Sequence, residues 1–328
     1  MKKVIRIIAF SIVFILLFEV ANDILIVKST NRYYMLRQEL KEQKAYDVQV
    51  FGSCHAYSSF NPIVLEEEYG ISAYNMSNPS EIMPATYLRV LEQLKKNKPK
   101  VVLVETWGIN AYETYISSDD IMQSAFPFNI GDIPVSKEKL EVINDFETLD
   151  FWEDNFAIFK YRSRIFDSSL SEIDFHYSFD KTKELYGEET DGWICVEMEN
   201  RFKHDGFLAK SSIPREDYEE RQNEVAEDDV LSIEPDIMKY VDKIIEICDS
   251  YDVKLIFYRT PYISTENELR KVNYLEQYLE QRGVDFYDME KEINYNYSED
   301  FNDYEHLSEI GARKTTEYLG EKIIEVLK

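Results

Sequence analysis

The sequence of 328 residues is poor in basic side chains and in glycine, and it holds only three cysteines. Its 37 lysines and arginines are outnumbered by 63 aspartates and glutamates, which gives a net charge of −26. A non-specific nucleic-acid binder needs a basic surface to displace counterions from phosphates, so we expect no nucleic-acid partner. The hydrophobic content of 44% is enough for a folded core and excludes a globally disordered chain.

The cysteines Cys54, Cys195 and Cys248 form no Cys-x-x-Cys pair. An odd number without paired spacing indicates neither a disulfide framework nor a zinc cluster, and one of the three is free to act as a chemical thiol. Cys248 falls on an apolar helical stripe, so we predict that it lies in the core; the sequence gives no position for Cys195. Only ten glycines occur. They make up about 3% of the chain, where roughly 7% is usual, so each glycine is more informative about turns.

The amino-terminal region carries a long apolar run. Three basic side chains precede position 7, and about 21 residues (7–27) then follow that are apolar apart from a few positions such as Glu19 and Asp23. This length spans a bilayer, and no small-x-small cleavage motif follows it. We therefore expect residues 1–28 to form an uncleaved, single-pass membrane anchor. A buried amphipathic helix is the alternative.

The orientation of this anchor depends on the charges beside it. Basic residues follow the run as well as precede it, which weakens the positive-inside contrast. We favour an amino terminus inside and the bulk of the chain outside the cytoplasm. Glu19 and Asp23 then either face a membrane partner or lie at the outer interface.

Strand and helix patterns alternate in two blocks of the sequence, 46–110 and 236–328. The blocks contain five short, largely apolar segments that are typical of buried strands. Five strand–helix units predict an α/β fold: a doubly wound, flavodoxin-like sheet of five parallel strands, with functional loops at the carboxyl ends of the strands. The strands are expected at Tyr46–Phe51, Ser72–Met76, Lys100–Glu105, Val253–Arg259 and Val284–Met289.

Capping residues mark the helices between these strands. Asn61 followed by Pro62 is typical of a helix start, with asparagine as the cap and proline at the first helical position. Gly70 and Gly283 are typical of helix ends. The last helix is expected to begin at Ser308.

Two further segments complete the predicted organisation. Residues 29–45 form a charged helical spacer, and residues 111–235 form an insertion without strand–helix rhythm. The insertion holds 31 acidic and 12 basic residues, so most of the negative charge belongs to it. Such a surface repels anionic polymers at short range. We therefore expect a neutral or zwitterionic substrate, or one that reaches the site from the membrane side.

Two motifs carry chemistry. The first predicted strand ends in Gly52-Ser53-Cys54-His55, and Asp303-Tyr304-Glu305-His306 stands just before the last helix. A nucleophile on a tight turn, together with Asp-x-x-His, provides the nucleophile, the base and the orienting acid of a proton relay. The motifs resemble those of the SGNH (GDSL) hydrolase superfamily. The whole pattern is similar to its membrane-anchored branch, which includes DltD, the D-alanine transfer protein of teichoic acid synthesis, and the alginate O-acetylation proteins.

This resemblance implies the roles of the motif residues. Cys54 stands where the family has its nucleophilic serine, His306 matches the base, and Asp303 matches the residue that orients the base. A thiolate is the stronger nucleophile and would form a thioester where the family forms an ester. The departure from serine also leaves open a loss of the serine-type activity.

The resemblance further implies an oxyanion hole made by the backbone N–H of Cys54, a donor from the second family motif and an asparagine from the third. Ser77 is the best match to the second motif, where the family has glycine. Asn110, in Gly108-Ile109-Asn110, is the best match to the third. Ordinary loop capping is the alternative for both residues.

The role of His55 next to the nucleophile is left open, and neither a metal site nor a cofactor is expected. His55 either tunes the thiol, touches substrate or is structural. A metal site built from Cys54, His55, Asp303 and His306 is not expected, because these residues come from two loops without metal-type spacing. No cofactor is expected either.

We expect a membrane-anchored, extracytoplasmic acyl esterase or acyltransferase of a cell-surface glycan or glycolipid, with an acyl-thioester intermediate. The resemblance implies a membrane-bound O-acyltransferase as a partner. One alternative is a non-catalytic accessory protein that binds a glycan or a membrane enzyme. The other is a soluble intracellular thioesterase.

Overall fold

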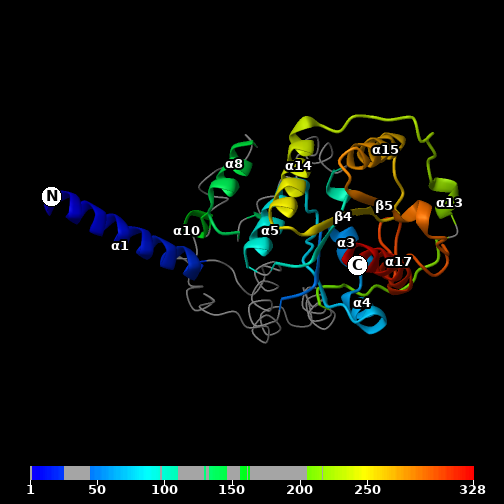
Figure 1. Cartoon of the computed structure of the whole chain (residues 1–328), viewed down its shortest axis with the longest axis horizontal. Helices are drawn as coiled ribbons and strands as arrows, with labels where there is room; N and C mark the ends of the chain where they lie inside the picture. The colour runs from blue at the N-terminus through cyan, green and yellow to red at the C-terminus, as the bar shows by residue number, and fades with distance from the viewer. Residues whose placement is uncertain are drawn as a thin grey trace.

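The computed structural model describes residues 2–25, 45–96, 98–109, 129–130, 133–145, 156–160, 162, 205–215 and 217–328. Nearly all of the predicted spacer (29–45), most of the predicted insertion (111–235), Asn110 and Cys195 lie outside the described residues. The boundaries of these predicted parts therefore stay predictions. In Figure 1 the sheet and its helices form one body, from which the amino-terminal helix projects.

The body is built on a sheet of five parallel strands in the order β2-β1-β3-β4-β5. This is the doubly wound, flavodoxin-like order, so the predicted fold class is confirmed. Each predicted strand is present and is shorter than its predicted range by one or two residues. The strands are β1 (Val48–Phe51), β2 (Ala73–Asn75), β3 (Val101–Glu105), β4 (Lys254–Arg259) and β5 (Asp285–Asp288).

Helices cover both faces of the sheet. In β3, Val102 and Val104 pack into one core and Val101 and Leu103 into the other, as expected for a strand buried on both sides. One face carries α5 (Met83–Lys96), α14 (Pro235–Ser250) and α15 (Glu266–Glu280). The other carries α3 (Cys54–Ser59), α4 (Pro62–Tyr69) and α17 (Glu309–Leu327). Short helices are also present: α8 (Lys137–Asp145), α10 (Ala157–Lys160), α13 (Tyr218–Arg221) and α16 (Met289–Glu292).

The predicted capping residues set the helix ends. Asn61 caps α4 by accepting from the Ile63 amide, Pro62 is the first helical residue, and Gly70 ends the helix at φ +68°. Ser308 caps α17 by accepting from the Gly311 amide. These features confirm the expected boundaries. The remaining predicted stop, Gly283, follows α15 in a turn.

Cys248 lies in the core, as predicted. Its side chain is fully buried on α14, against the face of the sheet that α5 also covers. Burial raises the pKa of the thiol to about 12, so Cys248 is protonated and unreactive at neutral pH.

The amino-terminal helix α1 (Lys2–Leu25) is long and apolar enough to cross a membrane over Lys2–Asn22, and this stretch is exposed on the protein. Its carboxyl end contacts α10. Phe18 packs edge-on against Phe156 with ring centroids 5.2 Å apart, and Asn22 Oδ1 accepts from the amide of Ile158 at 3.2 Å. The predicted helix is confirmed, whereas its insertion in a membrane and its orientation stay predictions.

Candidate active site

The turn after β1 presents Cys54 at the start of a helix. Gly52 has φ +136°, and a methyl group there would lie 2.9 Å from Cβ of Glu105, so only glycine fits. Ser53 caps α3 by accepting from the His55 amide at 3.2 Å. The loop predicted here from the sequence is wrong: the chain turns directly into α3, with Cys54 as its first residue and half-buried.

Asp303 and His306 form a hydrogen-bonded pair in the loop before α17, and we call this pair the outer arm. Asp303 Oδ1 accepts from the backbone amide of His306 at 2.7 Å and from that of Glu305 at 2.8 Å. His306 Nδ1 lies 2.9 and 3.0 Å from the two carboxylate oxygens. These contacts fix both the position of the loop and the orientation of the ring. Lys210 Nζ lies 3.9 Å from Oδ2 of the same carboxylate.

The two groups of the outer arm stabilise each other's charge. Burial disfavours the charged form of Asp303, but the hydrogen bond and charge of His306 lower the pKa of the carboxyl far below its ordinary value. Burial also opposes charge on His306, but Asp303 and then Cys54 raise the pKa of the ring to about 9. His306 is therefore a strong proton acceptor.

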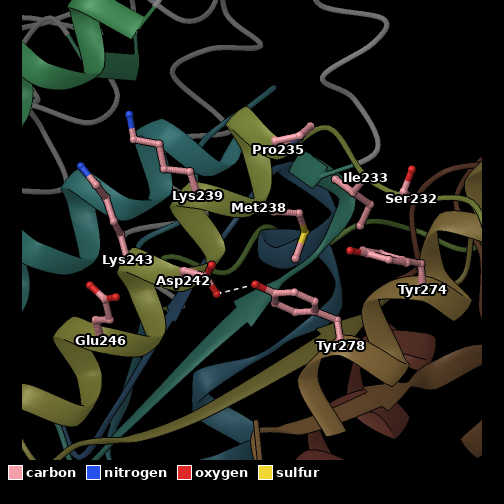
Figure 2. A pocket seen from close by; sticks show the side chains of 10 residues that line it. All are labelled: Ser232, Ile233, Pro235, Met238, Lys239, Asp242, Lys243, Glu246, Tyr274 and Tyr278. Atoms are coloured by element: carbon pink, nitrogen blue, oxygen red, sulfur yellow. Dashed lines mark hydrogen bonds between the residues drawn. The ribbon is translucent and has the colours of Figure 1, made fainter. Parts of the chain in front are cut away.

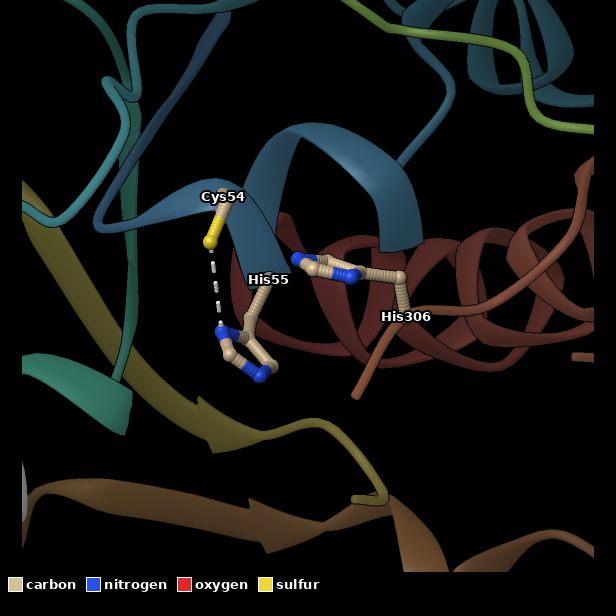
Figure 3. A group of neighbouring side chains, drawn as sticks. All are labelled: Cys54, His55 and His306. Atoms are coloured by element: carbon tan, nitrogen blue, oxygen red, sulfur yellow. Dashed lines mark hydrogen bonds between the residues drawn. The ribbon is translucent and has the colours of Figure 1, made fainter. Parts of the chain in front are cut away.

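The structure brings Cys54, His55 and His306 together (Figure 3). One donor atom from each residue lies within 4.8 Å of the others. Cys54 Sγ is 3.7 Å from His55 Nδ1, and the two imidazole rings stack with centroids 5.0 Å apart. His306 Nε2 is buried and has no hydrogen-bond partner among the described residues. The ring thus has one nitrogen on Asp303, and Cys54 is close enough to the ring to help raise its pKa.

His55 is 1% exposed and is packed between rings. It stacks on Trp107 with centroids 5.1 Å apart and meets Tyr262 edge-on at 5.1 Å. Burial and then the charge of His306 hold the pKa of His55 well below its usual value. His55 is therefore a neutral ring at physiological pH. The sequence leaves its role open, and the structure places it directly beside the sulfur.

A second hydrogen-bonded chain runs from Glu105 through Ser53 to His55, which lies beside Cys54, and we call it the inner arm. Glu105 at the end of β3 accepts from Ser53 Oγ at 3.1 Å, and Ser53 Oγ lies 3.2 Å from His55 Nδ1. Glu105 is fully buried and also accepts from the Trp107 amide at 3.0 Å and from Thr260 Oγ1 at 3.2 Å. Burial raises its pKa to about 7, although these hydrogen bonds act to lower it.

The sequence analysis missed Glu105 and Ser53 as parts of the site. The available signal was the acidic residue that closes an otherwise apolar buried strand, Val101–Glu105. A carboxyl at the carboxyl end of a central strand lies next to the turn of its neighbour.

The predicted oxyanion donors have different outcomes. The backbone N–H and the hydroxyl of Ser77 both donate to Asn75 Oδ1, the former at 3.3 Å. Ser77 would have to give up these bonds to serve an oxyanion, and its role stays a prediction. Asn110 lies outside the described residues. At Cys54 itself, the backbone N–H is in the first turn of α3, where no intrahelical partner is available.

Asn78 is a buried amide that lies next to the turn at Gly52. Its backbone N–H donates to Gly52 O at 3.1 Å, which fixes the residue beside the nucleophile turn. Its side chain is fully buried, and neither amide atom has a hydrogen-bond partner among the described residues. A buried amide without partners costs free energy unless a ligand or water satisfies it.

A separate pocket of about 690 Å³ lies between α14 and α15 (Figure 2). Lys239, Lys243 and Met238 line it, and Tyr278 donates to Asp242 at 2.6 Å across it. None of its lining residues belongs to the outer or the inner arm. This pocket is therefore distinct from the site at Cys54.

Comparisons with known proteins add little to this geometry. No family model matches the chain, and no curated protein matches it. Among solved structures, one described as a lipolytic protein of the G-D-S-L family, from Desulfitobacterium hafniense DCB-2, aligns with 84% of this chain and 97% of its own. The TM-score is 0.40 and the sequence identity is 10%. A likeness at this level carries no argument about function, which must rest on the site.

Proposed function

We propose that this protein is an acyl esterase or acyltransferase in which Cys54 is the nucleophile, His306 the base and Asp303 the residue that orients the base. The observation that carries the proposal is the position of His306: one ring nitrogen is held by Asp303, and the other is buried without a partner next to Cys54. Because its pKa is about 9, the ring in this arrangement holds the thiol proton as imidazolium while the sulfur attacks, and later gives that proton to the leaving group.

The chemistry has two halves. His306 Nε2 takes the proton of the Cys54 thiol, and the sulfur attacks the acyl carbonyl carbon, whose oxygen takes up the negative charge. The intermediate collapses to an acyl thioester, and the leaving alcohol receives the proton from His306. Water or a glycan hydroxyl then gives its proton to His306 and attacks the thioester, which releases the acyl product and restores the thiol.

The negative oxygen of the intermediate needs preorganised donors. In this proposal the backbone N–H of Cys54 supplies one donor and the side-chain amide of Asn78 supplies another. Asn78 suits the role because it is anchored on Gly52 and its buried amide has no other partner among the described residues. It thus replaces Ser77, whose donors are engaged by Asn75.

The setting of the enzyme is the second part of the proposal. Helix α1 is long and apolar enough to anchor the protein in a membrane, and in this proposal the rest of the chain lies outside the cytoplasm. The acceptor would be a cell-surface glycan or glycolipid, with a membrane-bound O-acyltransferase as the partner that presents the acyl group. The excess of acidic residues in 111–235 supports a neutral or zwitterionic acceptor.

An activated ester tests the chemistry directly. The full-length protein in detergent, incubated with p-nitrophenyl acetate, should gain one acetyl group by intact mass, and peptide mapping should place it on Cys54. The Cys54→Ala protein should gain none. Cys248→Ala is the matched control, because it removes a buried cysteine and should label like the wild type.

A folded wild-type protein that is free of metal and stays unlabelled over a range of acyl esters would reject the catalytic proposal. It would favour the non-catalytic accessory protein, which the replacement of serine by cysteine supports. Recovery of the protein from cells in the soluble fraction would favour the intracellular thioesterase instead.

A further inference from the structure

The grouping of Cys54, His55 and His306 offers a thiol and two imidazoles to a single point (Figure 3). Thiolate sulfur and imidazole nitrogen are the donor types that zinc prefers. Cys54 and His55 lie in α3, whereas His306 lies in the loop before α17, 252 positions after Cys54. No spacing rule could therefore reveal the group from the sequence.

The distances suit a tetrahedral ion. Zinc bonds to sulfur at about 2.3 Å and to nitrogen at about 2.0–2.1 Å, so two such ligands of one tetrahedral ion lie about 3.6 Å apart. The observed separation of Cys54 Sγ from His55 Nδ1 is 3.7 Å. The third donor comes from His306, and all three donor atoms lie within 4.8 Å of one another.

The surroundings of His306 also fit a metal ligand. A zinc-bound imidazole usually donates its other N–H to a carboxylate, which fixes the ring and strengthens the ligand. Asp303 holds Nδ1 of His306 at 2.9 Å, and Nε2 is buried without a partner among the described residues. The described residues offer three donors at this point, so water would take the fourth zinc position.

We propose that Cys54, His55 and His306 bind a zinc ion, and that the bound ion holds the enzyme in an inactive state. Binding releases to solvent every proton carried by the Cys54 sulfur and by the binding nitrogen of His306, and it forms one zinc–sulfur bond and two zinc–nitrogen bonds. The ion then occupies the sulfur and the ring nitrogen that the relay needs, so neither nucleophilic attack nor proton transfer can occur until the metal leaves. Zinc binding itself does not depend on the proposed acyl chemistry, whereas its inhibitory effect rests on it.

Cobalt reports the ligands without any activity assay. The full-length protein, prepared in detergent, metal-free and without a histidine tag, is titrated with Co²⁺ and then with Zn²⁺. We expect one equivalent of Co²⁺ to give a thiolate-to-metal charge-transfer band in the near ultraviolet and strong visible bands of tetrahedral geometry. One equivalent of Zn²⁺ should abolish both.

Variants identify the donors. Cys54→Ser should lose the charge-transfer band, and His55→Gln and His306→Gln should lose the tetrahedral visible bands. Asp303→Asn should weaken zinc binding by about 10-fold to 100-fold, as is usual for the loss of a carboxylate that supports a ligand. Cys248→Ala should bind like the wild type. Circular dichroism checks that each variant is folded.

Two results would overturn the site: no charge-transfer band in the wild type, or equal zinc affinity in the wild type and Cys54→Ser. The second would mean that zinc binds only to acidic groups on the surface. The role is tested apart from the site by ester labelling of the metal-free protein, which one equivalent of zinc should suppress at least 10-fold. Labelling that requires zinc would overturn the inhibitory role, and a metal-free protein that binds zinc but never labels would reject the proposed function alone.

Discussion

The two arms that meet at Cys54 use the same side chain, histidine, in opposite environments. In the outer arm His306 is held by a charged and partly exposed carboxylate, and its pKa rises to about 9. In the inner arm His55 is enclosed by rings and linked through Ser53 to a fully buried carboxyl, and its pKa falls well below the usual value. Local charge and solvent access, not residue type, thus decide which histidine can exchange a proton.

The comparison assigns a separate task to each arm. The outer arm can gain and lose a proton at the reaction centre, because Asp303 stabilises the charged ring. The inner arm positions the nucleophile turn, because its buried hydrogen bonds connect β1, β3 and α3. Disrupting the outer arm should therefore reduce the rate, and disrupting the inner arm should reduce stability.

The largest difference between the arms should appear in the two histidine variants. His306→Gln removes the proposed base, and we expect the rate of acetyl transfer from p-nitrophenyl acetate to Cys54 to fall by about 10⁴-fold, as for other relay members. His55→Gln should lower that rate less than 10-fold in the metal-free protein. Stopped-flow release of p-nitrophenol measures both rates. Equal losses in the two variants would contradict the separate tasks.

Asn78 belongs to neither arm, so it tests whether charge stabilisation is separate from proton transfer. Asn78→Ala removes the proposed oxyanion donor, and kcat for ester hydrolysis should fall about 10²-fold to 10³-fold with little change in KM. Ser77→Ala is the matched control, one residue away on the same loop, and should change kcat less than 5-fold. A larger effect at Ser77 would restore the assignment made from the sequence.

Glu105 gives the inner arm a measurable pH dependence of stability. Its pKa is raised from 4.5 to about 7 in the folded protein, so the folded state holds a proton that the unfolded state loses. Stability should then fall as the pH rises from about 4.5 to about 7, by about 3 kcal/mol. Glu105→Gln should remove this decline. Urea unfolding at pH 4.5, 6 and 8 measures it, and parallel pH profiles of the two proteins would argue against a buried neutral carboxyl.

Ser53 should show the smallest effect and the clearest separation of stability from rate. Ser53→Ala removes the cap of α3 and the hydrogen bond to Glu105, which should cost about 1–3 kcal/mol of unfolding free energy. The labelling rate of Cys54 should change less than 10-fold. Thermal unfolding and ester labelling on the same sample compare the two quantities. A rate loss as large as that of His306→Gln would give Ser53 a direct part in catalysis.

The fold was largely predictable because its signals are local. Strand periodicity, the Asn61-Pro62 start and the Gly70 stop depend on neighbouring residues only, and all three appear in the structure. The Asp303–His306 pair was equally accessible, because three residues separate its members in one loop. Structure that depends only on neighbouring residues, such as a strand, a helix end or a pair within one loop, can be predicted from those residues.

The inner arm and Asn78 depend instead on how separate strands meet. Glu105 reaches Ser53 only because β3 lies beside β1, at a register that the sequence does not specify. Motif matching also favoured Ser77 over Asn78, since it compares residue types at aligned positions and cannot show which side chain already has partners. The positions of these hydrogen-bonding groups follow from how the strands pack, which only the structure shows.

The close fit of Gly52 against Glu105 has a consequence for the variation of this site. With 2.9 Å between Cβ of Glu105 and a methyl group at position 52, the nucleophile turn and the end of β3 cannot be altered independently. Grafting the Gly-Ser-Cys-His turn onto another sheet would fail unless the neighbouring strand were transferred with it. The smallest part of the fold that preserves this site is thus a pair of adjacent strands rather than a four-residue motif.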